Sequence, residues 1–144
     1  GRGADIARDA QALGAHVYID SSQEDAAARL RQMGGAQVVM TTITDSRAAS
    51  ALIAGLAPQG RLLVLGVGKD PLGVAPGAMV AGERMVQGAI TGSPYESEKT
   101  LEFSVLADVR PMIETFPLER AQEAYRRMRS GQARFRIVLT MQDA

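Results

Sequence analysis

The fold is decided by the stretch AQVVMTTITDSRAASALIAGLAPQGRLLVLGV, residues 36–67. Its two ends, residues 36–42 and 62–67, are nearly continuous apolar runs of the kind found in buried parallel strands. Asp45 is placed to cap a helix between them, which we expect to run to Leu56. A strand, a helix and a second strand form a βαβ unit, so the stretch predicts a parallel sheet in an α/β fold.

The alternation of helices and strands extends toward the N-terminus. Residues 6–13 carry apolar side chains on one helical face, and residues 16–20 read as a short strand. Ser21 and Glu24 have the spacing of a capping box, which predicts that the next helix begins there.

The C-terminal half continues the pattern. Residues 85–90 predict a strand, and Ser93-Pro94-Tyr95-Glu96 is a strong helix start, with serine as the cap and glutamate three residues later. We expect residues 111–116 to be extended, a last helix to run from residue 118 to its end at Gly131, and residues 135–141 to form a final strand.

Composition excludes several classes of function. Sixteen basic residues balance sixteen acidic ones, so no net charge attracts nucleic acid or an anionic membrane. No apolar run approaches the roughly 20 residues that span a bilayer, and a cytoplasmic location is expected. The chain has no cysteine and one histidine, so we expect no metal ligands in it.

Ligands of open α/β sheets bind outside the carboxyl ends of the strands. The residues at the predicted ends are Asp20-Ser21, Thr41-Thr42, Val67-Gly68 and Thr91-Gly92-Ser93. They are either ordinary turn residues or a surface on which a flat ligand meets main chain. Arg134 and Arg136 follow the end of the last predicted helix, near the final strand, where a guanidinium is able to reach a pyrophosphate.

No residue stands out as catalytic. His16 has no visible partner and is interpreted as structural, and Glu114 as a polar contact at a surface or between domains. The phosphate-cradling pattern G-x-G-x-x-G is absent, because Gly66-Val67-Gly68 is not followed by a helix with the third glycine.

Much of the chain resembles a known family, the zinc-dependent alcohol dehydrogenases. The match is to the cinnamyl-alcohol and bacterial broad-range branch of the medium-chain dehydrogenase/reductase superfamily. The resemblance is carried at the C-terminus by residues 110–121, Tyr125, Met128, Ser130-Gly131 and residues 133–139, and upstream by residues 13–20, 56–62 and 65–67.

The resemblance implies hydride transfer between a zinc-bound alcohol or aldehyde and NADP or NAD. By position, Arg136 is similar to the arginine that contacts the cofactor pyrophosphate, and Thr41 and Thr42 to the adenosine-side edge of the sheet. Arg2 is similar to an arginine that binds the 2′-phosphate of NADP, and no acidic residue that would favour NAD is visible there.

Four further residues resemble main-chain segments that hold the nicotinamide ring and its carboxamide. They are Val67, Gly68, Gly92 and Ser93.

The resemblance also implies a division of the chain. Residues 1–109 correspond to a partial Rossmann-type, doubly wound parallel sheet that binds NAD(P), without its first strands and glycine fingerprint. Residues 110–144 correspond to a segment that returns to the catalytic domain and completes the cofactor site. The catalytic domain and every zinc ligand are expected N-terminal to this chain, so the chain is expected to be inactive alone. Family dimers pair through the strand similar to residues 85–90, so a homodimer is expected.

Two alternatives stay open. One is a zinc-independent quinone or enoyl reductase of the same superfamily. Zinc analysis of the complete protein distinguishes it from a zinc-dependent alcohol dehydrogenase. The other is a non-catalytic α/β interaction module, which does not predict nucleotide binding.

The resemblance makes a prediction about the isolated chain. In the sheet order 3-2-1-4-5-6 the strand at residues 16–20 has no neighbour. We therefore expect the isolated chain to exchange elements with a second copy, to rearrange this segment, or to be stable only beside the missing part. A dispersed NMR spectrum of a folded monomer at low concentration would count against this expectation.

Overall fold

The computed structural model describes residues 1–90 and 92–141 in two compact units, Gly1–Thr91 and Gly92–Ala144. Thr91, predicted at the end of a strand, lies outside the described residues. The predicted division after residue 109 concerns function rather than compactness and stays a prediction.

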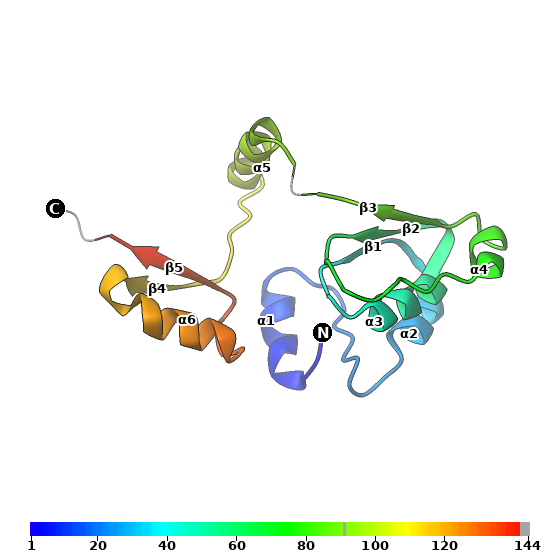
Figure 1. Ribbon diagram of the computed structural model, residues 1–144, viewed down its shortest axis with the longest axis horizontal. Coiled ribbons are helices and arrows are strands. Elements are labelled where there is room, and N and C mark those ends of the chain that lie inside the picture. The colour runs from blue at the N-terminus through cyan, green and yellow to red at the C-terminus, as the bar shows by residue number, and fades with distance from the viewer. Residues whose placement is uncertain (91, 142–144) are drawn as a thin grey trace. The chain divides into compact units, whose positions relative to one another are not determined.

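The first unit contains a three-stranded sheet in the order β1-β2-β3, shown in Figure 1. Both pairings are parallel, with Val39 beside Leu62 and Leu62 beside Val86. The parallel α/β class predicted from the sequence is therefore confirmed. The elements of this unit are the 3-10 helix η1 (Ala4–Ile6), α1 (Ala7–Ala12), α2 (Ala26–Gln32), β1 (Ala36–Thr41), α3 (Ser46–Ala51), the 3-10 helix η2 (Leu52–Gly55), β2 (Leu56–Val64), α4 (Pro76–Val80) and β3 (Met85–Gly88).

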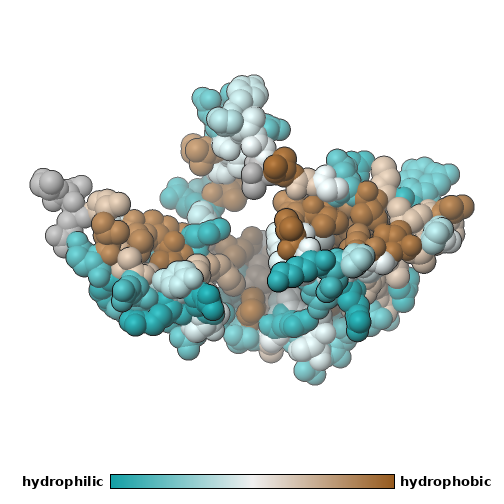
Figure 2. All heavy atoms as spheres, in the orientation of Figure 1, coloured by the Kyte–Doolittle hydropathy of each residue, from teal (hydrophilic) through white to brown (hydrophobic). Residues whose placement is uncertain are grey.

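The core of this unit lies on one face of the sheet. Leu62 is fully buried and packs with Ile53 and Leu56, on the side where Figure 1 shows α2 and α3. The opposite face carries Val38 and Met40, which are 52% and 64% exposed. Figure 2 shows the hydrophobic surface over these strands. Within this unit, helices therefore cover only one of the two faces expected for a doubly wound sheet.

Aspartate carboxylates cap the N-termini of α2 and α3. Asp45 accepts backbone hydrogen bonds at the start of α3, as predicted. The predicted capping box of Ser21 and Glu24 is wrong, because α2 begins later, at Ala26. Its N-cap is Asp25, whose carboxylate accepts from the Ala27 and Ala28 amides at 2.8 and 3.1 Å. The Ser21 hydroxyl instead donates to the Gly1 carbonyl at 2.9 Å.

The predicted strand at residues 16–20 is not formed. The Gly1 amine donates to the Ile19 carbonyl at 3.1 Å, and the Ser21 amide donates to the Gly1 carbonyl at 2.9 Å. These two bonds have the pattern of one step of a parallel ladder. A strand needs several consecutive steps, so the segment stays extended without becoming one.

The helix predicted to reach Leu56 ends earlier. α3 stops at Ala51, η2 follows, and Leu56 already pairs with Ala36 as the first residue of β2. The next paired residue, Arg61, lies beside Val38, so residues 57–60 bulge out of the ladder. Pro58 lacks an amide hydrogen and Gln59 has φ of 59°, which explains the bulge.

The second unit contains a parallel pair of strands joined through a helix. Its elements are α5 (Pro94–Leu106), β4 (Ile113–Pro117), the 3-10 helix η3 (Leu118–Arg120), α6 (Ala121–Arg129) and β5 (Arg136–Thr140). The predicted helix start at Ser93 is confirmed, with a complete capping box to Glu96. The predicted final strand is also confirmed, and it pairs with β4 from Ile113 beside Arg136 onward.

No helix in the described part of the chain is both long and apolar enough to cross a membrane.

The buried core gives a stability prediction. Leu62→Ala should lower the free energy of unfolding of the first unit by about 2–5 kcal/mol, because it leaves a cavity beneath the sheet. Urea unfolding followed by circular dichroism measures the change. Val80→Ala, at a side chain that is 79% exposed, is the control and should change stability by less than about 0.5 kcal/mol. Equal effects of the two substitutions would show that Leu62 is not the centre of this core.

Candidate functional site

The strands of the first unit end at a common edge of the sheet. Thr41 pairs with Val64, and Val64 pairs with Gly88, so the last residues of β1, β2 and β3 lie in one row. Since the strands are parallel, the segments that follow them also emerge at this edge. It is the edge at which α/β sheets bind ligands.

Thr41 joins two of these segments. Its carbonyl oxygen accepts the Leu65 amide at 2.9 Å and the Gly66 amide at 3.3 Å. Its side chain is buried, and its hydroxyl accepts the Ile43 amide at 3.4 Å. Thr42 is exposed directly beside it. Thr41 therefore holds the edge together, while Thr42 is available to a ligand.

The glycines after β2 allow its loop to pack against the loop after β1. A Cβ at Gly66 would overlap the Ile43 carbonyl, and one at Gly68 would lie 2.5 Å from the Thr44 carbonyl oxygen. Val67, between them, is 89% exposed. The close approach that these glycines permit is thus between two loops, and it presents Val67 at the surface.

Two serines of α3 fasten the far end of this loop. The Ser46 hydroxyl donates to the Asp70 carbonyl at 2.7 Å, and the Ser50 hydroxyl accepts the Gly73 amide at 3.0 Å. Sequence reasoning missed both residues. The available signal was a pair of serines four residues apart on a helix, which places them on one face.

Arg2 belongs to the same unit, and hydrogen bonds hold its neighbour Gly3. The Gly3 amide donates to the Asp20 carboxylate at 3.1 Å, and the Tyr18 hydroxyl donates to the Gly3 carbonyl at 2.8 Å. Hydrogen bonds from Ser22 and from Gly3 hold the pKa of the Asp20 carboxyl below its ordinary value. The Arg2 side chain is exposed.

Gly92 and Ser93 stand at the start of the second unit. Gly92 has φ of 87°, a conformation that favours glycine. The Ser93 amide donates to the Glu96 carboxylate at 2.6 Å, and this bond lowers the pKa of that carboxyl. Ser93 therefore caps α5, and its backbone amide already has a partner.

Arg136 begins β5 and is exposed. It pairs with Ile113, and the next pair along the ladder is Glu114 with Ile137. The Glu114 side chain bonds to Arg127 on α6, so the side chains of the Arg136 pair lie on the opposite face of the two strands. That face is the one away from α6.

The predicted site residues thus fall into two groups. The edge of the first sheet brings together Thr41, Thr42, Val67 and Gly68, and Arg2 belongs to the same unit. Gly92, Ser93 and Arg136 belong to the second unit.

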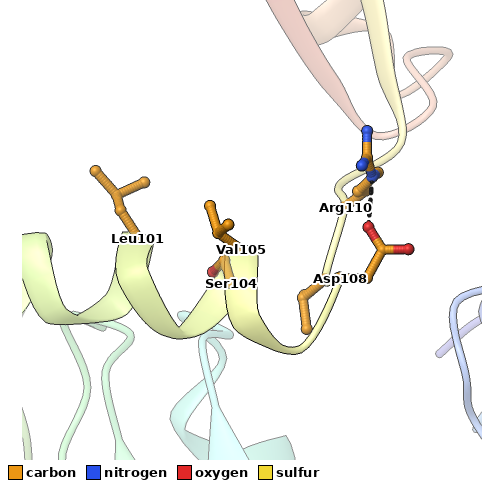
Figure 3. A pocket seen from close by; sticks show the side chains of 6 residues that line it. Leu101, Ser104, Val105, Asp108 and Arg110 are labelled. Atoms are coloured by element: carbon orange, nitrogen blue, oxygen red, sulfur yellow. Dashed lines mark hydrogen bonds and ion pairs between the residues drawn. The ribbon is translucent and has the colours of Figure 1, made fainter.

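Two surface cavities of the second unit contain none of the predicted residues. One, of about 420 Å³, is lined by side chains of α6 that include Tyr125 and Arg126. The other, of about 310 Å³, lies along the end of α5 (Figure 3), where Leu101 and Val105 stand near the exposed ion pair of Asp108 and Arg110.

Within residues 1–90 and 92–141, no three histidine, aspartate or glutamate side chains are grouped closely enough to hold a metal ion. The described residues therefore do not fit a zinc ion.

Comparison with known families decides the relationship. Residues 2–105 match the family described as zinc-binding dehydrogenase. The chain belongs to the zinc-binding dehydrogenase family. The resemblance drawn from the sequence is thereby confirmed.

Curated relatives of this zinc-binding dehydrogenase chain bear the names of alcohol dehydrogenases. Alcohol dehydrogenase patD of Penicillium expansum is 36% identical over 132 residues, covering 92% of this chain and 38% of the relative. Alcohol dehydrogenase notN of Aspergillus sp. (strain MF297-2) is 36% identical over 140 residues, covering 97% and 41%. The chain spans about two fifths of the length of these relatives.

Solved structures share the fold. The alcohol dehydrogenase of Aeropyrum pernix superimposes with a TM-score of 0.83 at 20% identity, covering 96% of this chain and 41% of that one. A cinnamyl alcohol dehydrogenase of Sorghum bicolor gives 0.77 at 23% identity, covering 99% and 41%. These structures have the same Rossmann-type arrangement of strands and helices.

The packing of the two loops gives a prediction. Gly66→Ala should lower the free energy of unfolding by about 1–3 kcal/mol, because the new methyl group displaces the Ile43 main chain. Thermal unfolding measures the loss. Gly88→Ala is the matched control, since a Cβ there meets nothing within 4 Å. If both variants have the same melting temperature, the packing of the two loops does not depend on glycine at position 66.

Proposed function

We propose that this chain is the cofactor-binding part of an alcohol dehydrogenase that transfers hydride between an alcohol or aldehyde and a nicotinamide nucleotide. The observation that carries the proposal is the shared carboxyl edge of β1 and β2, built by Thr41, Thr42, Val67 and Gly68. The family match and the names of the relatives support the same activity.

The surface of the edge suits a flat, polar ligand. The exposed Val67 offers an apolar contact, and the glycines beside it let its loop lie against the loop after β1, which keeps Val67 at the surface. Thr42 adds an exposed hydroxyl for a ribose. These features fit a nicotinamide nucleotide, and we assign Thr41 and Thr42 to its adenosine side.

The charged parts of the nucleotide have candidate partners as well. We assign the pyrophosphate to Arg136, whose planar guanidinium is exposed and suited to two phosphate oxygens. We assign the carboxamide end to Val67, Gly68, Gly92 and Ser93. Because the Ser93 amide bonds to Glu96 and the Ser93 carbonyl accepts two bonds from Ser97, a contact from Ser93 would come from the hydrogen of its hydroxyl.

We propose NADP as the preferred nucleotide. Arg2 is exposed, so its charge is presented to solvent, and Asp20 and Tyr18 hold the neighbouring Gly3 by hydrogen bonds. A 2′-phosphate adds two negative charges and three acceptor oxygens for such a group.

The division of chemistry follows from the residues. The bound nicotinamide supplies or accepts the hydride. The residues of this chain bind and orient the nucleotide, and none of the described side chains is assigned a proton transfer. We propose that zinc and its ligands belong to another part of the complete enzyme, so this chain alone does not catalyse.

We also propose a homodimer that forms through β3. In the part of the chain that the structure describes, β3 pairs with β2 on one side and forms the edge of the sheet. The unpaired amides and carbonyls of such an edge favour pairing with a second copy.

Calorimetric titration of the chain with NADPH and NADH tests the assignments. Arg136→Ala should weaken both nucleotides on the order of tenfold, because a charge-assisted pyrophosphate contact is lost. Arg126→Ala removes the same charge from the exposed surface of α6 and should leave both affinities nearly unchanged. Arg2→Ala should weaken NADPH alone.

Each outcome bears on a separate assignment. If Arg136→Ala and Arg126→Ala lower nucleotide affinity equally, Arg136 acts only through its positive charge and not through a specific pyrophosphate contact. An Arg2→Ala variant that keeps its preference for NADPH would overturn the role of Arg2. Absence of binding by the unchanged chain would contradict a nucleotide site within this chain.

A further inference from the structure

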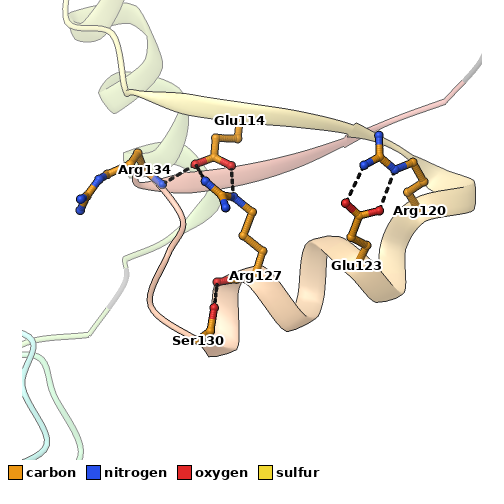
Figure 4. Close-up of polar contacts among 6 residues, drawn as sticks. All are labelled: Glu114, Arg120, Glu123, Arg127, Ser130 and Arg134. Carbon is orange, nitrogen blue, oxygen red and sulfur yellow. Dashed lines mark hydrogen bonds and ion pairs between the residues drawn. The ribbon is translucent and has the colours of Figure 1, made fainter.

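One carboxylate in the second unit connects three segments of the chain. Glu114, in β4, accepts hydrogen bonds from the Nε and Nη2 atoms of Arg127 on α6, the latter at 3.1 Å. It also accepts the Arg134 amide at 2.8 Å, in the turn that leads into β5. Figure 4 shows these bonds converging on the single side chain.

The connection controls the start of β5. Arg134 lies two residues before Arg136, and the Phe135 and Arg136 amides both donate to the Met112 carbonyl, at 3.2 and 3.3 Å. The turn is therefore fastened in two ways, by a carboxylate on the α6 face and by the main-chain carbonyl of the residue just before β4.

We propose that Glu114 is a positioning residue for Arg136, which fixes the place where that guanidinium meets the phosphates of a bound nucleotide. The inference rests on the proposed function. Glu114 does not touch the ligand in this account, because its side chain lies on the α6 face and Arg136 lies on the other face. It acts through the backbone of residues 134–136.

The electrostatics of the pair support this role. Hydrogen bonds from Arg127 and from the Arg134 amide hold the pKa of the Glu114 carboxyl below its ordinary value. The Glu114 side chain is 23% exposed and that of Arg127 is 38% exposed, so solvent only partly reaches the pair. The carboxylate remains charged and bonded at neutral pH.

The same helix offers a matched comparison. Glu123 accepts two hydrogen bonds from Arg120, at 2.8 and 2.6 Å, as Figure 4 also shows. This pair has the same chemistry but joins residues only three positions apart, and its hydrogen bonds link η3 to α6 rather than to the turn before β5. Glu114→Gln and Glu123→Gln therefore remove the same charge and the same kind of ion pair. Only the first weakens the contact to the turn before Arg136, because glutamine keeps one acceptor oxygen where Glu114 uses two.

The sign of the effect separates positioning from simple charge. Both substitutions remove a negative charge, so general electrostatics predicts equal or tighter binding of an anionic nucleotide. Positioning predicts that Glu114→Gln weakens NADPH binding on the order of tenfold, while Glu123→Gln changes it by less than about twofold. Glu114→Asp keeps the charge but shortens the side chain, and it should also weaken binding.

The experiment measures nucleotide affinity by calorimetry and amide hydrogen exchange of residues 134–138 in the full chain. Glu114→Gln should accelerate exchange at Arg136 and leave the amides of β1 unchanged, which shows that the first unit folds. Continued protection of Val138, which pairs with Thr115, shows that β4 and β5 of the second unit still pair. In an Arg136→Ala background, Glu114→Gln should cause no further loss of affinity.

Unchanged or tighter binding by Glu114→Gln, or unchanged exchange at Arg136, would overturn the inference. If the unchanged chain binds neither NADPH nor NADH, the proposed function fails for this chain. Hydrogen exchange at Arg136 then tests, without a ligand, whether Glu114 holds the turn before β5.

Discussion

The parallel pairing of β1 with β2 is the constraint on which the first unit depends. Parallel neighbours cannot be joined by a tight turn, so the chain between them must cross the sheet, and α3 and η2 make that crossing. The crossing places Ile53 and Leu56 over the fully buried Leu62. It also brings the ends of both strands to one edge. The hydrophobic core and the candidate binding edge therefore have the same origin.

The edge shows how main chain prepares a surface for a ligand. The Thr41 carbonyl accepts two amides of the following loop, and the glycines of that loop let it lie against its neighbour. The loop is then fastened to α3 by Ser46 and Ser50. Under the proposed function, binding groups on such a frame would need little reorganisation when a nucleotide binds, which limits the entropy lost on binding.

The second unit repeats the parallel plan with a polar connection in place of a large core. Only Ala124 among its described residues is buried, so α6 is held to its two strands partly by Glu114 and Arg127. Such a bridge is directional, because it fixes hydrogen-bond geometry as well as distance. In this unit, hydrogen bonds orient a few side chains, and there is no large close-packed interior among the described residues.

The sequence by itself determined the features that depend on neighbours along the chain. Apolar runs marked β1, β2 and β5, and the capping box of Ser93 and Glu96 marked the start of α5, because strand burial patterns and helix caps are local. The alternation of strands and helices also indicated the α/β class, and quoted motifs indicated the family.

Only the tertiary structure decided the features that need a distant partner. Residues 16–20 have the composition of a strand, but a strand exists only beside another that continues its ladder. Leu56 joined β2 rather than the preceding helix because Ala36 lies beside it. Glu114 found its partners 13 and 20 residues away, which no local spacing reveals. Pairing across the chain, not composition, fixed these residues and the face on which Arg136 stands.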